Sequence, residues 1–495
     1  MTPYSQLETH FARIGNLDDA VGLLHWDMST VMPRGGAGAR AEQMATLRGL
    51  RHSLIAGPEV ADLLSAAEAS NSLTTWQQAN LAEMRRGQIH AAAVEGKLIE
   101  ALSKACGTCE MIWRDARPAG DFKAVRPVLT EVLRLGREFG AAKAEKLGCS
   151  PYEALLDEWE PGGRAETIDI VFDDLADFLP GFINDVLDNQ AKSPAARLPE
   201  GPFSAEKQRI LGEKFMARLG FEFDRGRLDQ SHHPFCGGAT DDVRITTRYD
   251  ESDFVEGLMA ILHETGHALY ELGLPKDWQR QPVGRARGMA MHESQSLLIE
   301  MQACRTREFM KYAAPLMRKA FGGKGPDWSA ANLHKLYTRV RRSFIRTEAD
   351  EVTYPAHVIL RYRLEKAMVA GDLEIADLPG AFNDGLEAIL GIRPPDDSKG
   401  CLQDIHWYAG AWGYFPTYTL GAIAAAQLFD AAKKSNKEIL PSIGRGDFAP
   451  LLTWLRANVH SKGSLQSMPD LLKAATGRAL DPETYKAHLK ARYLG

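Results

Sequence analysis

The motif His263-Glu264-Thr265-Gly266-His267 contains the residues of this sequence that are best suited to chemistry. Apolar residues recur every fourth position from Phe254 to Leu262, which predicts that the motif lies on an amphipathic helix. On a helix, the two histidines lie one turn apart on the same side and can bind one divalent metal ion. Glu264 lies one residue further round, where it can act as a general base without binding the metal. This arrangement is typical of a zinc-dependent peptidase.

The helix expected at this motif has signals at both ends. Asp253, with Glu256 three residues later, resembles a capping box, and Gly273 followed by Pro275 predicts where the helix stops. An alternative interpretation is an ordinary buried helix with two hydrogen-bonded histidines. The helical context and the end signals favour the metal site, because many chance matches to the motif would fall in loops.

Metal coordination of this type needs a third protein ligand, and a carboxylate from the next helix is the natural candidate. That helix is expected from residue 289 and carries Glu293 and Glu300. Two helical turns separate these residues by about 10 Å, so both cannot bind the same ion. Glu293 stands at the start of its helix, nearer a cleft mouth, and is favoured. Glu300 is then expected to be solvated or to support a ligand.

The rest of the chain is predicted to be overwhelmingly helical. In the first 220 residues, helical periodicity covers residues 3–25, 37–54, 58–70, 73–117, 122–147, 150–158, 165–193 and 204–220. Residues 242–249 instead alternate apolar and polar side chains, which predicts a half-exposed strand. The free edge of this strand could pair with an extended peptide substrate, or the strand could belong to a structural hairpin.

Composition limits the class of protein. The chain has 495 residues, 44% hydrophobic and 25% charged, with a net charge of −6, values typical of a soluble globular protein. The negative charge gives no electrostatic reason to expect nucleic acid or an anionic membrane as a partner. The first residues lack a basic region followed by an apolar run, and no apolar stretch approaches the roughly 18 residues of a membrane span. We therefore expect a cytoplasmic location.

Two other patterns are expected to be structural. The six cysteines are sparse for a chain of this length. Cys106 and Cys109 have the spacing of a metal or redox pair, but no second pair accompanies them, and we expect two thiols on a helix. Residues 321–327 are rich in glycine yet lack the spacing of a phosphate-binding loop, which predicts an ordinary loop.

Six ordered motifs span the C-terminal half of the chain. In chain order they are His233-Pro234-Phe235, Asp242-x-Arg244-x-Thr246, His263-Glu264-x-x-His267, His292-Glu293-Ser294-Gln295-Ser296, Ile345-Arg346-x-x-Ala349-Asp350-Glu351-x-Thr353-Tyr354-x-x-His357 and Gly400-x-x-Gln403-Asp404-x-His406-Trp407. With these motifs, the chain resembles the metallocarboxypeptidases of the carboxypeptidase Taq family, in the glutamate-zincin group. Trp26-Asp27 and Met32-Pro33 also fit, so the likeness covers most of the chain. The mild departures are Val352 and Val358, where the family often has Leu and Ile.

The resemblance implies a mainly α, zincin-type fold with a deep active-site cleft and a small β-sheet beside the metal-binding helix. We expect one catalytic unit over residues 1–495, with a helical cleft wall at about 1–220, a catalytic core at about 221–430 and C-terminal helices at 431–495. The resemblance also implies a homodimer that removes single residues from peptide C-termini, tolerates many side chains and accepts proline poorly.

The resemblance implies roles for single residues as well. His263, His267 and Glu293 would bind one divalent ion and Glu264 would be the general base, which decides between Glu293 and Glu300. Zinc is expected, with cobalt or manganese as alternatives, since imidazole and carboxylate ligands suit several metals.

Peptide hydrolysis needs a donor for the tetrahedral oxygen, and a carboxypeptidase also needs a group that binds the free α-carboxylate. His406, Tyr414 and Tyr418 are candidates for the first task, although each could instead pack in the core. Arg346 is chosen for the second, because a guanidinium matches a carboxylate bidentately. Arg244 is the reserve, and it could instead pair with Asp242 or Asp350. The groups considered for positioning the substrate, any of which could equally be a buried structural residue, are His233, Asp350, Tyr354 and His357.

Two other functions fit the same motifs. An endopeptidase or a dipeptide-releasing enzyme would share the metal site and differ only in what closes the cleft. A non-catalytic helical protein could bind peptides in the cleft without hydrolysing them. Glu264 argues against the second interpretation, because a structural metal site has no need of that carboxylate.

Overall fold

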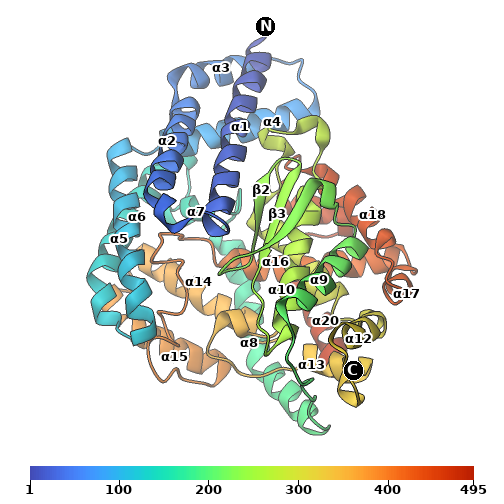
Figure 1. The fold of residues 1–495 in the computed structure, drawn as a ribbon. Helices are drawn as coiled ribbons and strands as arrows, with labels where there is room; N and C mark the ends of the chain where they lie inside the picture. The colour runs from blue at the N-terminus through green and yellow to red at the C-terminus, as the bar shows by residue number, and fades with distance from the viewer.

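A computed structural model describes all residues, 1–495, which form helices almost throughout and one small three-stranded sheet (Figure 1). The mainly α fold with a small sheet is therefore confirmed. The helices are α1 Pro3–Ser29, α2 Ala37–Ala56, α3 Pro58–Glu68, α4 Thr75–Ala92, α5 Gly96–Ala119, α6 Phe122–Leu147, α7 Pro151–Leu156, α8 Ala165–Ala191, α9 Ala205–Leu219, α10 Phe254–Glu271, α11 Gly288–Leu297, α12 Arg307–Phe321, α13 Ala330–Tyr337, α14 Tyr354–Ala370, α15 Leu378–Leu390, α16 Pro416–Ser435, α17 Ile439–Ile443, α18 Ala449–Asn458, α19 Met468–Thr476 and α20 Pro482–Tyr493.

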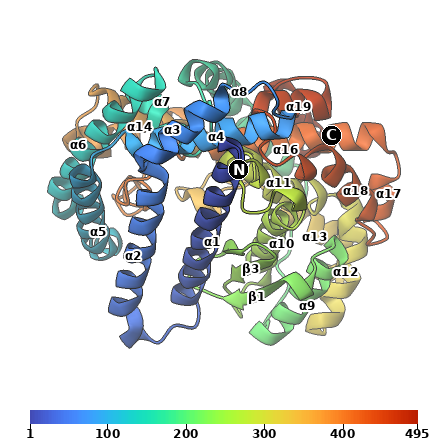
Figure 2. The same cartoon turned by 90° about the horizontal axis from the view of Figure 1, so that it is seen from above.

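The first four helices form a layer with a small core of its own. Residues such as Leu7 and Phe11 of α1 pack there against Val60 and Leu64 of α3 and Met84 of α4. Seen from above, α1 and α2 lie side by side and α4 crosses their upper ends (Figure 2). A second and much larger core of 89 buried residues extends from Cys109 to Tyr493 and includes most of the remaining helices.

The single helix predicted for residues 73–117 is wrong, because the chain forms α4 and α5 there. Glu95 adopts φ −65° and ψ 141°, an extended conformation that ends the helical path, and Gly96 begins the next helix. The side chain of Val94 is buried at this corner. Asn80 of α4 donates hydrogen bonds to the Tyr4 hydroxyl at 3.1 Å and to Gln281 Oε1 at 3.0 Å. These long-range contacts fix the direction of α4, while α5 packs on α6.

The sheet has the strand order β1-β3-β2, with β1 Gly226–Gln230, β2 Phe235–Ala239 and β3 Asp242–Thr247. The strand predicted at residues 242–249 is thus present as β3. It pairs in parallel with β1 and antiparallel with β2. Both of its edges are occupied, so the hypothesis that this strand pairs with a peptide substrate is wrong. The sheet edge next to α1 belongs to β2.

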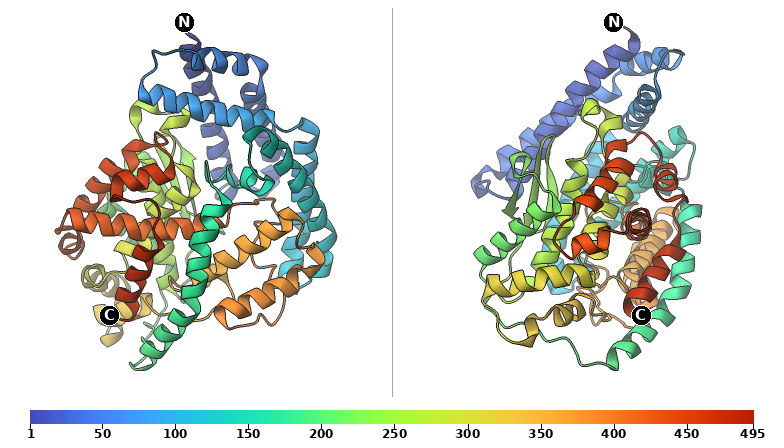
Figure 3. Two further views of the ribbon diagram at one scale, coloured as in Figure 1. Left: turned by 180° about the vertical axis from the view of Figure 1, so that it is seen from behind. Right: turned by 90° about the vertical axis from the view of Figure 1, so that its right-hand side faces the viewer.

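Three helices meet beneath the sheet. Val243 and Ile245 of β3 pack against Ile261 and Ala268 of α10. On its other side, α10 packs on α11, and α11 packs on the largely buried helix α16. Seen from behind, α20 lies beside α8 near the C-terminus (Figure 3). No helix of the chain combines the length and apolar character needed to cross a bilayer.

The predicted structural roles of the cysteines and of the glycine-rich segment agree with the fold. Cys106 and Cys109 both lie on α5 and both are free thiols. Burial raises the pKa of Cys106 to about 11 and that of Cys109 to about 12, which leaves neither thiol reactive. Residues 322–325 form the turn that links α12 to the next short helix.

Candidate active site

The motif His263-Glu264-Thr265-Gly266-His267 lies on α10, where His263 is half-buried and the other four residues are buried. The side chain of Asp253 caps the helix by accepting a hydrogen bond from the backbone N–H of Val255 at 2.7 Å. Glu256 does not complete a capping box, so that part of the expectation is wrong. The helix ends at Glu271, close to the predicted stop.

Three candidate metal ligands come together from α10 and α11. One ligand atom each from His263, His267 and Glu293 lies within 4.8 Å of the other two. The Oε2 atom of Glu293 is 3.7 Å from Nε2 of His263 and 3.4 Å from Nε2 of His267. Two imidazole nitrogens and one carboxylate oxygen form a donor set that suits a divalent ion such as zinc, with a fourth position left for water.

Nδ1 of each imidazole, the ring nitrogen that faces away from Glu293, already has a hydrogen-bond partner. Nδ1 of His263 lies 3.0 Å from Oε2 of Glu300, and Nδ1 of His267 lies 3.1 Å from the carbonyl oxygen of His292 and 2.6 Å from its Nδ1. Nε2 of His292 in turn lies 2.8 Å from Oε1 of Glu271. These contacts turn both Nε2 atoms toward Glu293, and such support is typical of metal-binding histidines.

Glu300 is buried rather than solvated, so the first of its two predicted environments is wrong. Besides His263, its carboxylate pairs with the guanidinium of Arg305. Glu300 lies in a π-helical segment, η5 Leu298–Ala303, which continues α11 with wider turns. Glu293 and Glu300 therefore contact opposite nitrogens of the same imidazole, and only Glu293 faces both Nε2 atoms.

The charges at this cluster also fit a cation. Burial alone would raise the pKa of Glu293, but His263 and His267 hold it at about 2. Burial would lower the pKa of His263, yet the carboxylates of Glu293, Glu300 and Glu264 together raise it to about 10. The surplus of carboxylates over cationic side chains around the two imidazoles favours a bound positive ion.

Glu264 differs from the other carboxylates of the cluster. Burial is the largest cause that raises its pKa to about 7; His263 and His292 act to lower the pKa, and the charges of Glu293 and Glu300 act to raise it. A carboxyl group that titrates near neutrality can both accept and return a proton, as a general base must. Glu264 is not among the grouped ligand atoms, in agreement with its expected position beside the metal rather than on it.

Two glycines allow the helices to approach closely enough to form the cluster. A Cβ atom at Gly266, within the α10 motif, would lie 2.4 Å from the carbonyl oxygen of Gln295 on α11. A Cβ atom at Gly421, on α16, would lie 2.9 Å from Cβ of Glu293. The helix that carries the candidate ligand Glu293 therefore packs between α10 and α16 at distances that a side chain at either glycine would not permit.

The three predicted oxyanion donors form one group next to Glu293. Nε2 of His406 lies 3.2 Å from the hydroxyl of Tyr418, and the Tyr414 and Tyr418 rings are 5.2 Å apart. The charge of Glu293 acts to raise the pKa of Tyr414, Tyr418 and also Tyr354, although burial is the larger cause for each. Burial lowers the pKa of His406 to about 3, so its imidazole is neutral. The phenols are therefore protonated donors beside the candidate metal ligand.

Arg346 is buried beside these tyrosines and shares a carboxylate with a second arginine. Its Nε and Nη2 donate to Oδ1 of Asp404 at 3.0 and 2.8 Å, and its Nη1 lies 3.4 Å from the hydroxyl of Tyr354. Arg361 donates from Nε to the other oxygen of Asp404 at 2.6 Å, and its Nη2 has no partner. Two buried guanidiniums thus share one carboxylate, and the cluster keeps one positive charge in excess.

Arg244 and His233 do not join this group in the structure. Arg244 binds Asp242 with both ends of its fork, at 2.9 and 2.7 Å, and its guanidinium lies 4.1 Å from the Trp26 ring. It pairs with Asp242, one of the two partners predicted as alternatives to substrate. His233 lies exposed in the loop before β2, and only its carbonyl oxygen is hydrogen-bonded.

Asp350 is half-buried and His357 is buried, and the surroundings of both suit a structural role. The carboxylate of Asp350 accepts hydrogen bonds from the backbone N–H groups of Arg341, Val352 and Thr353. His357 is fully buried, and neither of its ring nitrogens has a partner. The charges of Arg361 and Arg346 add to burial in lowering its pKa.

No role is predicted from the sequence for His292, Glu271 or Arg361, which support the residues described above. For two of them, the position in the sequence relative to a candidate metal ligand could have predicted the role. His292 directly precedes the candidate ligand Glu293, and Glu271 follows His267 by one helical turn. Arg361 carries no such signal, because its partner Asp404 lies 43 residues away in the sequence.

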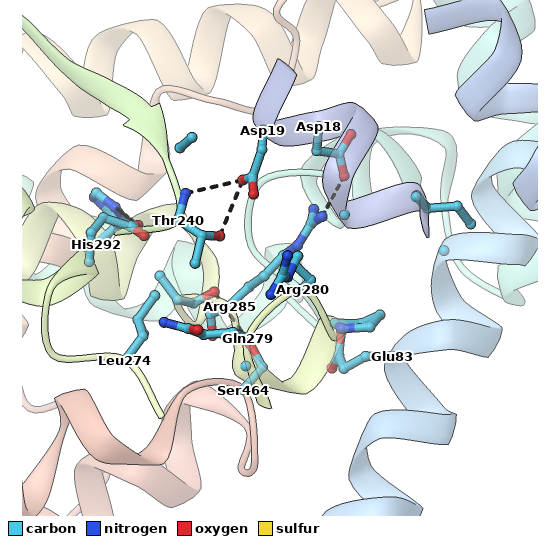
Figure 4. Close-up of a pocket in the computed structure, with 18 of the residues that line it drawn as sticks. Asp18, Asp19, Glu83, Thr240, Leu274, Gln279, Arg280, Arg285, His292 and Ser464 are labelled. Carbon is cyan, nitrogen blue, oxygen red and sulfur yellow. Dashed lines mark hydrogen bonds and ion pairs between the residues drawn. The ribbon is translucent and has the colours of Figure 1, made fainter. Parts of the chain in front are cut away.

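A cavity of about 620 Å³ opens on the His267 side of the cluster. It lies between α1, β2 and the segment 274–288, and its lining includes Cys236 and His292. Figure 4 shows its polar wall, where Arg285 pairs with Asp18 and where Asp19 accepts hydrogen bonds from Thr240. The cavity is bordered by His292, which supports His267, but none of the three candidate metal ligands lines it.

Comparison with known proteins agrees with this geometry. Residues 6–493 match the family described as carboxypeptidase Taq (M32) metallopeptidase. The chain belongs to this family. It is 37% identical to thermostable carboxypeptidase 1 of Thermus thermophilus over 95% of this chain and 94% of that protein. It is 32% identical to carboxypeptidase 1 of Bacillus subtilis over 97% of this chain and 96% of that protein.

Solved structures show the same fold. Metallocarboxypeptidase 1 of Trypanosoma cruzi superimposes with a TM-score of 0.97 at 38% identity, covering 100% of this chain and 99% of that one. The M32 carboxypeptidase of Deinococcus radiodurans gives a TM-score of 0.93 at 35% identity, covering 99% and 98%. The resemblance seen in the motifs is confirmed, and this M32 family member is a metallocarboxypeptidase. As a metallopeptidase it uses a divalent metal ion, and the residues His263, His267 and Glu293 fit such an ion.

Proposed function

We propose that this M32 enzyme hydrolyses the last peptide bond of peptides with a free C-terminus and releases single amino acids. The observation that carries the proposal is the excess positive charge of Arg346 and Arg361 around Asp404. Arg346 contacts Tyr354 and Tyr418, and the charge of the candidate metal ligand Glu293 acts to raise the pKa of both tyrosines. A buried positive charge beside a hydrolytic centre suits the α-carboxylate of a peptide end. An endopeptidase would have no use for such a group.

His263, His267 and Glu293 hold the metal in this proposal, and zinc is the ion that their donor set favours. When bound, such an ion lowers the pKa of water toward about 7 and polarises the scissile carbonyl. Glu264 takes the proton of the attacking water and returns it to the departing amine. Its pKa near 7 supports both steps.

The hydroxyl groups of Tyr414 and Tyr418 and the ring of His406 are the proposed donors to the oxygen that becomes negative during attack. They support the reaction best as neutral donors, and burial keeps the phenols protonated by raising their pKa. The hydrogen bond between His406 and Tyr418 holds one phenol in place. Tyr418 is also held from the other side, because the guanidinium of Arg346 lies 4.8 Å from its ring.

Arg346 binds the α-carboxylate in this proposal. Asp404 holds its Nε and Nη2, so Nη1, which makes only a long contact of 3.4 Å to Tyr354, is the group left for the substrate. The upstream part of the peptide then extends away from Arg346, toward the cavity lined by Cys236 and His292. Arg244 and His233 take no part in this arrangement.

A pair of peptides that differ only at the C-terminus tests the proposal. We expect rapid release of the last residue from the free acid and little hydrolysis of the amide. We further expect Arg346→Ala to lower kcat/KM for the free acid by about 100-fold or more and to leave the amide unchanged, because the variant loses a buried charged contact. Equal cleavage of both peptides by the wild-type enzyme would contradict the proposal and favour an endopeptidase.

Arg363→Ala is a matched control for this experiment. Arg363 lies on α14 like Arg361, but it pairs with Asp173 at the surface. We expect this variant to keep full activity on the free acid. A loss equal to that of Arg346→Ala would show that removal of any arginine from this region disturbs the enzyme.

The remaining parts of the proposal follow from the resemblance and from composition. We expect a cytoplasmic homodimer with broad side-chain tolerance and poor acceptance of proline, which binds neither nucleic acid nor membranes. The net charge of −6 supports the last two points. Light scattering on the purified protein checks the dimer, and a series of peptides with different final residues checks the side-chain preference. A monomer, or rapid release of a C-terminal proline, would contradict the corresponding part.

A further inference from the structure

The π-helical segment η5, which carries Glu300, is closed by an arginine from the last helix of the chain. The carbonyl groups at the C-terminal end of any helix lack partners within that helix. Arg492 of α20 donates from Nη1 to the carbonyl oxygen of Met301 at 2.5 Å and from Nη2 to that of Gln302 at 3.2 Å. One guanidinium, about 190 residues away in the sequence, therefore caps the end of η5.

Arg492 is itself held by a buried carboxylate. Its Nη1 lies 2.8 Å from Oε2 of Glu351, whose side chain is completely buried. Glu351 also accepts hydrogen bonds from Gln302 of η5 at 2.8 Å and from Tyr493 of α20 at 2.9 Å, and Nε2 of His488 lies 2.8 Å from its Oε1. Oε1 of Glu351 is thus shared between Gln302 of η5 and His488 of α20, whereas Oε2 is held by Arg492 and Tyr493 of α20. This arrangement fixes the position of the segment from outside the metal centre.

The position of η5 matters because Glu300 reaches the candidate metal ligand from it. Oε2 of Glu300 lies 3.0 Å from Nδ1 of His263, whose Nε2 faces Glu293. Glu300 lies two residues before Gln302, and the carbonyl group of Gln302 is one of the two that Arg492 caps. A shift of a few tenths of an ångström in η5 would lengthen the contact that orients the imidazole, and such supporting contacts contribute to metal affinity.

We infer that Arg492 is a positioning residue for the metal centre, acting through η5 and Glu300 on His263. The inference rests on the proposed assignment of His263 as a metal ligand. It makes the last helix of the chain a determinant of metal affinity, although no residue of α20 contacts a candidate metal ligand.

The test is a double-mutant cycle read out by metal affinity. The affinity for zinc is measured by competition with a chromophoric chelator for the full chain and for the variants Arg492→Ala, Glu300→Gln and their combination. We expect each single substitution to weaken zinc binding by about 10-fold or more, the usual range for residues that support a metal ligand. If Arg492 acts through Glu300, the combined variant should be no weaker than Glu300→Gln alone.

Several outcomes would overturn the inference. Zinc affinity unchanged by Arg492→Ala would do so, and so would losses that multiply in the combined variant, because the two residues would then act independently. A contact that only stabilises the fold would lower the melting temperature of the metal-free protein and leave zinc affinity unchanged. Arg478→Ala is the matched control, since Arg478 pairs with Asp481 at the surface just before α20.

Two further variants keep the result decisive. If Arg492→Ala does not fold, Arg492→Lys retains the charge but cannot cap two carbonyls and also bind Glu351, and the same cycle is run with it. His263→Ala separates this inference from the ligand assignment. Loss of tight zinc binding in His263→Ala supports the assignment, whereas its retention would remove both the assignment and the inference.

Discussion

Each histidine of the candidate metal centre is held by the ring nitrogen that faces away from Glu293. His263 uses Nδ1 to contact Glu300, and His267 uses Nδ1 to contact the carbonyl oxygen of His292. Because Nδ1 is occupied, the lone pair of each Nε2 is directed into the space between the two rings and Glu293. The chemistry of the site therefore depends on residues that do not belong to the ligand set.

Glu264 gives the sharpest prediction for a single side chain. Glu264→Gln keeps the size and the hydrogen-bonding oxygen of the residue but cannot accept a proton. We expect the variant to bind zinc as tightly as the wild type and to lose a factor of about 10³ or more in kcat. Metal analysis and steady-state kinetics on one free-ended peptide check this. Near-full activity would exclude Glu264 as the general base.

We predict that the buried carboxyl group of Glu365 makes the stability of the folded protein depend on pH. It is buried, accepts hydrogen bonds from Tyr152 and Trp407, and burial raises its pKa from 4.5 to about 8. The folded protein therefore holds a proton that the unfolded chain releases above pH 4.5. The resulting stability is complete below about pH 4.5 and is lost as the pH rises through about 8.

Glu365→Gln mimics the protonated form at every pH and should not lose this stability. We expect the melting temperature of the variant, relative to wild type, to rise by at least about 2 °C between pH 5 and pH 8.5. Thermal unfolding in one buffer series measures the difference. Parallel curves for the two proteins would show that the Glu365 carboxyl does not titrate in this range.

At the scale of elements, the metal centre depends on how closely α10 and α11 approach. Gly266 lies where a Cβ atom would be 2.4 Å from the carbonyl oxygen of Gln295. Glu293 lies two residues before Gln295 on the same helix, so a displacement of α11 would carry the third candidate ligand with it. Gly266 is therefore constrained by helix packing, although it takes no part in the chemistry.

Gly266→Ala should weaken both the fold and the metal site. We expect a loss of about 1–3 kcal/mol in stability from overpacking, together with weaker zinc binding. Gly107→Ala on the exposed face of α5 is the control, because a Cβ there meets nothing within 4 Å, and alanine should stabilise that helix. Calorimetry and chelator competition measure the two effects. Unchanged zinc affinity in Gly266→Ala would mean that α11 absorbs the added methyl without moving Glu293.

At the scale of the whole molecule, a metal ion held by His263, His267 and Glu293 would join two neighbouring helices, α10 and α11. A ligand that binds only the folded state stabilises it, by about 2.7 kcal/mol at a free concentration 100 times its Kd. We expect a chelator to lower the melting temperature of the wild-type enzyme and added zinc to restore it. His267→Ala should melt at the same temperature with and without chelator. A shift of equal size in that variant would place the stabilising ion elsewhere.

The sequence by itself determined the features that depend on neighbouring residues. The spacing of His263 and His267 on one helical turn, the periodicity of α1, α6 and α8, and the alternation in β3 are local patterns, and the structure contains each of them. Helical hydrogen bonds join residues four apart, so a short stretch of sequence suffices to specify them. The ordered motifs likewise sufficed to recognise the family.

Only the tertiary structure decided the features that depend on distant residues. It divided the segment 73–117 into α4 and α5, buried Glu300 against His263, and gave Arg346 a carboxylate that it shares with Arg361. It also paired both edges of β3 and capped η5 with Arg492. Apart from the pairing of β2 with β3, which are neighbours in the sequence, these outcomes involve contacts between residues tens to hundreds of positions apart. Such contacts leave no periodic trace in the sequence around either partner.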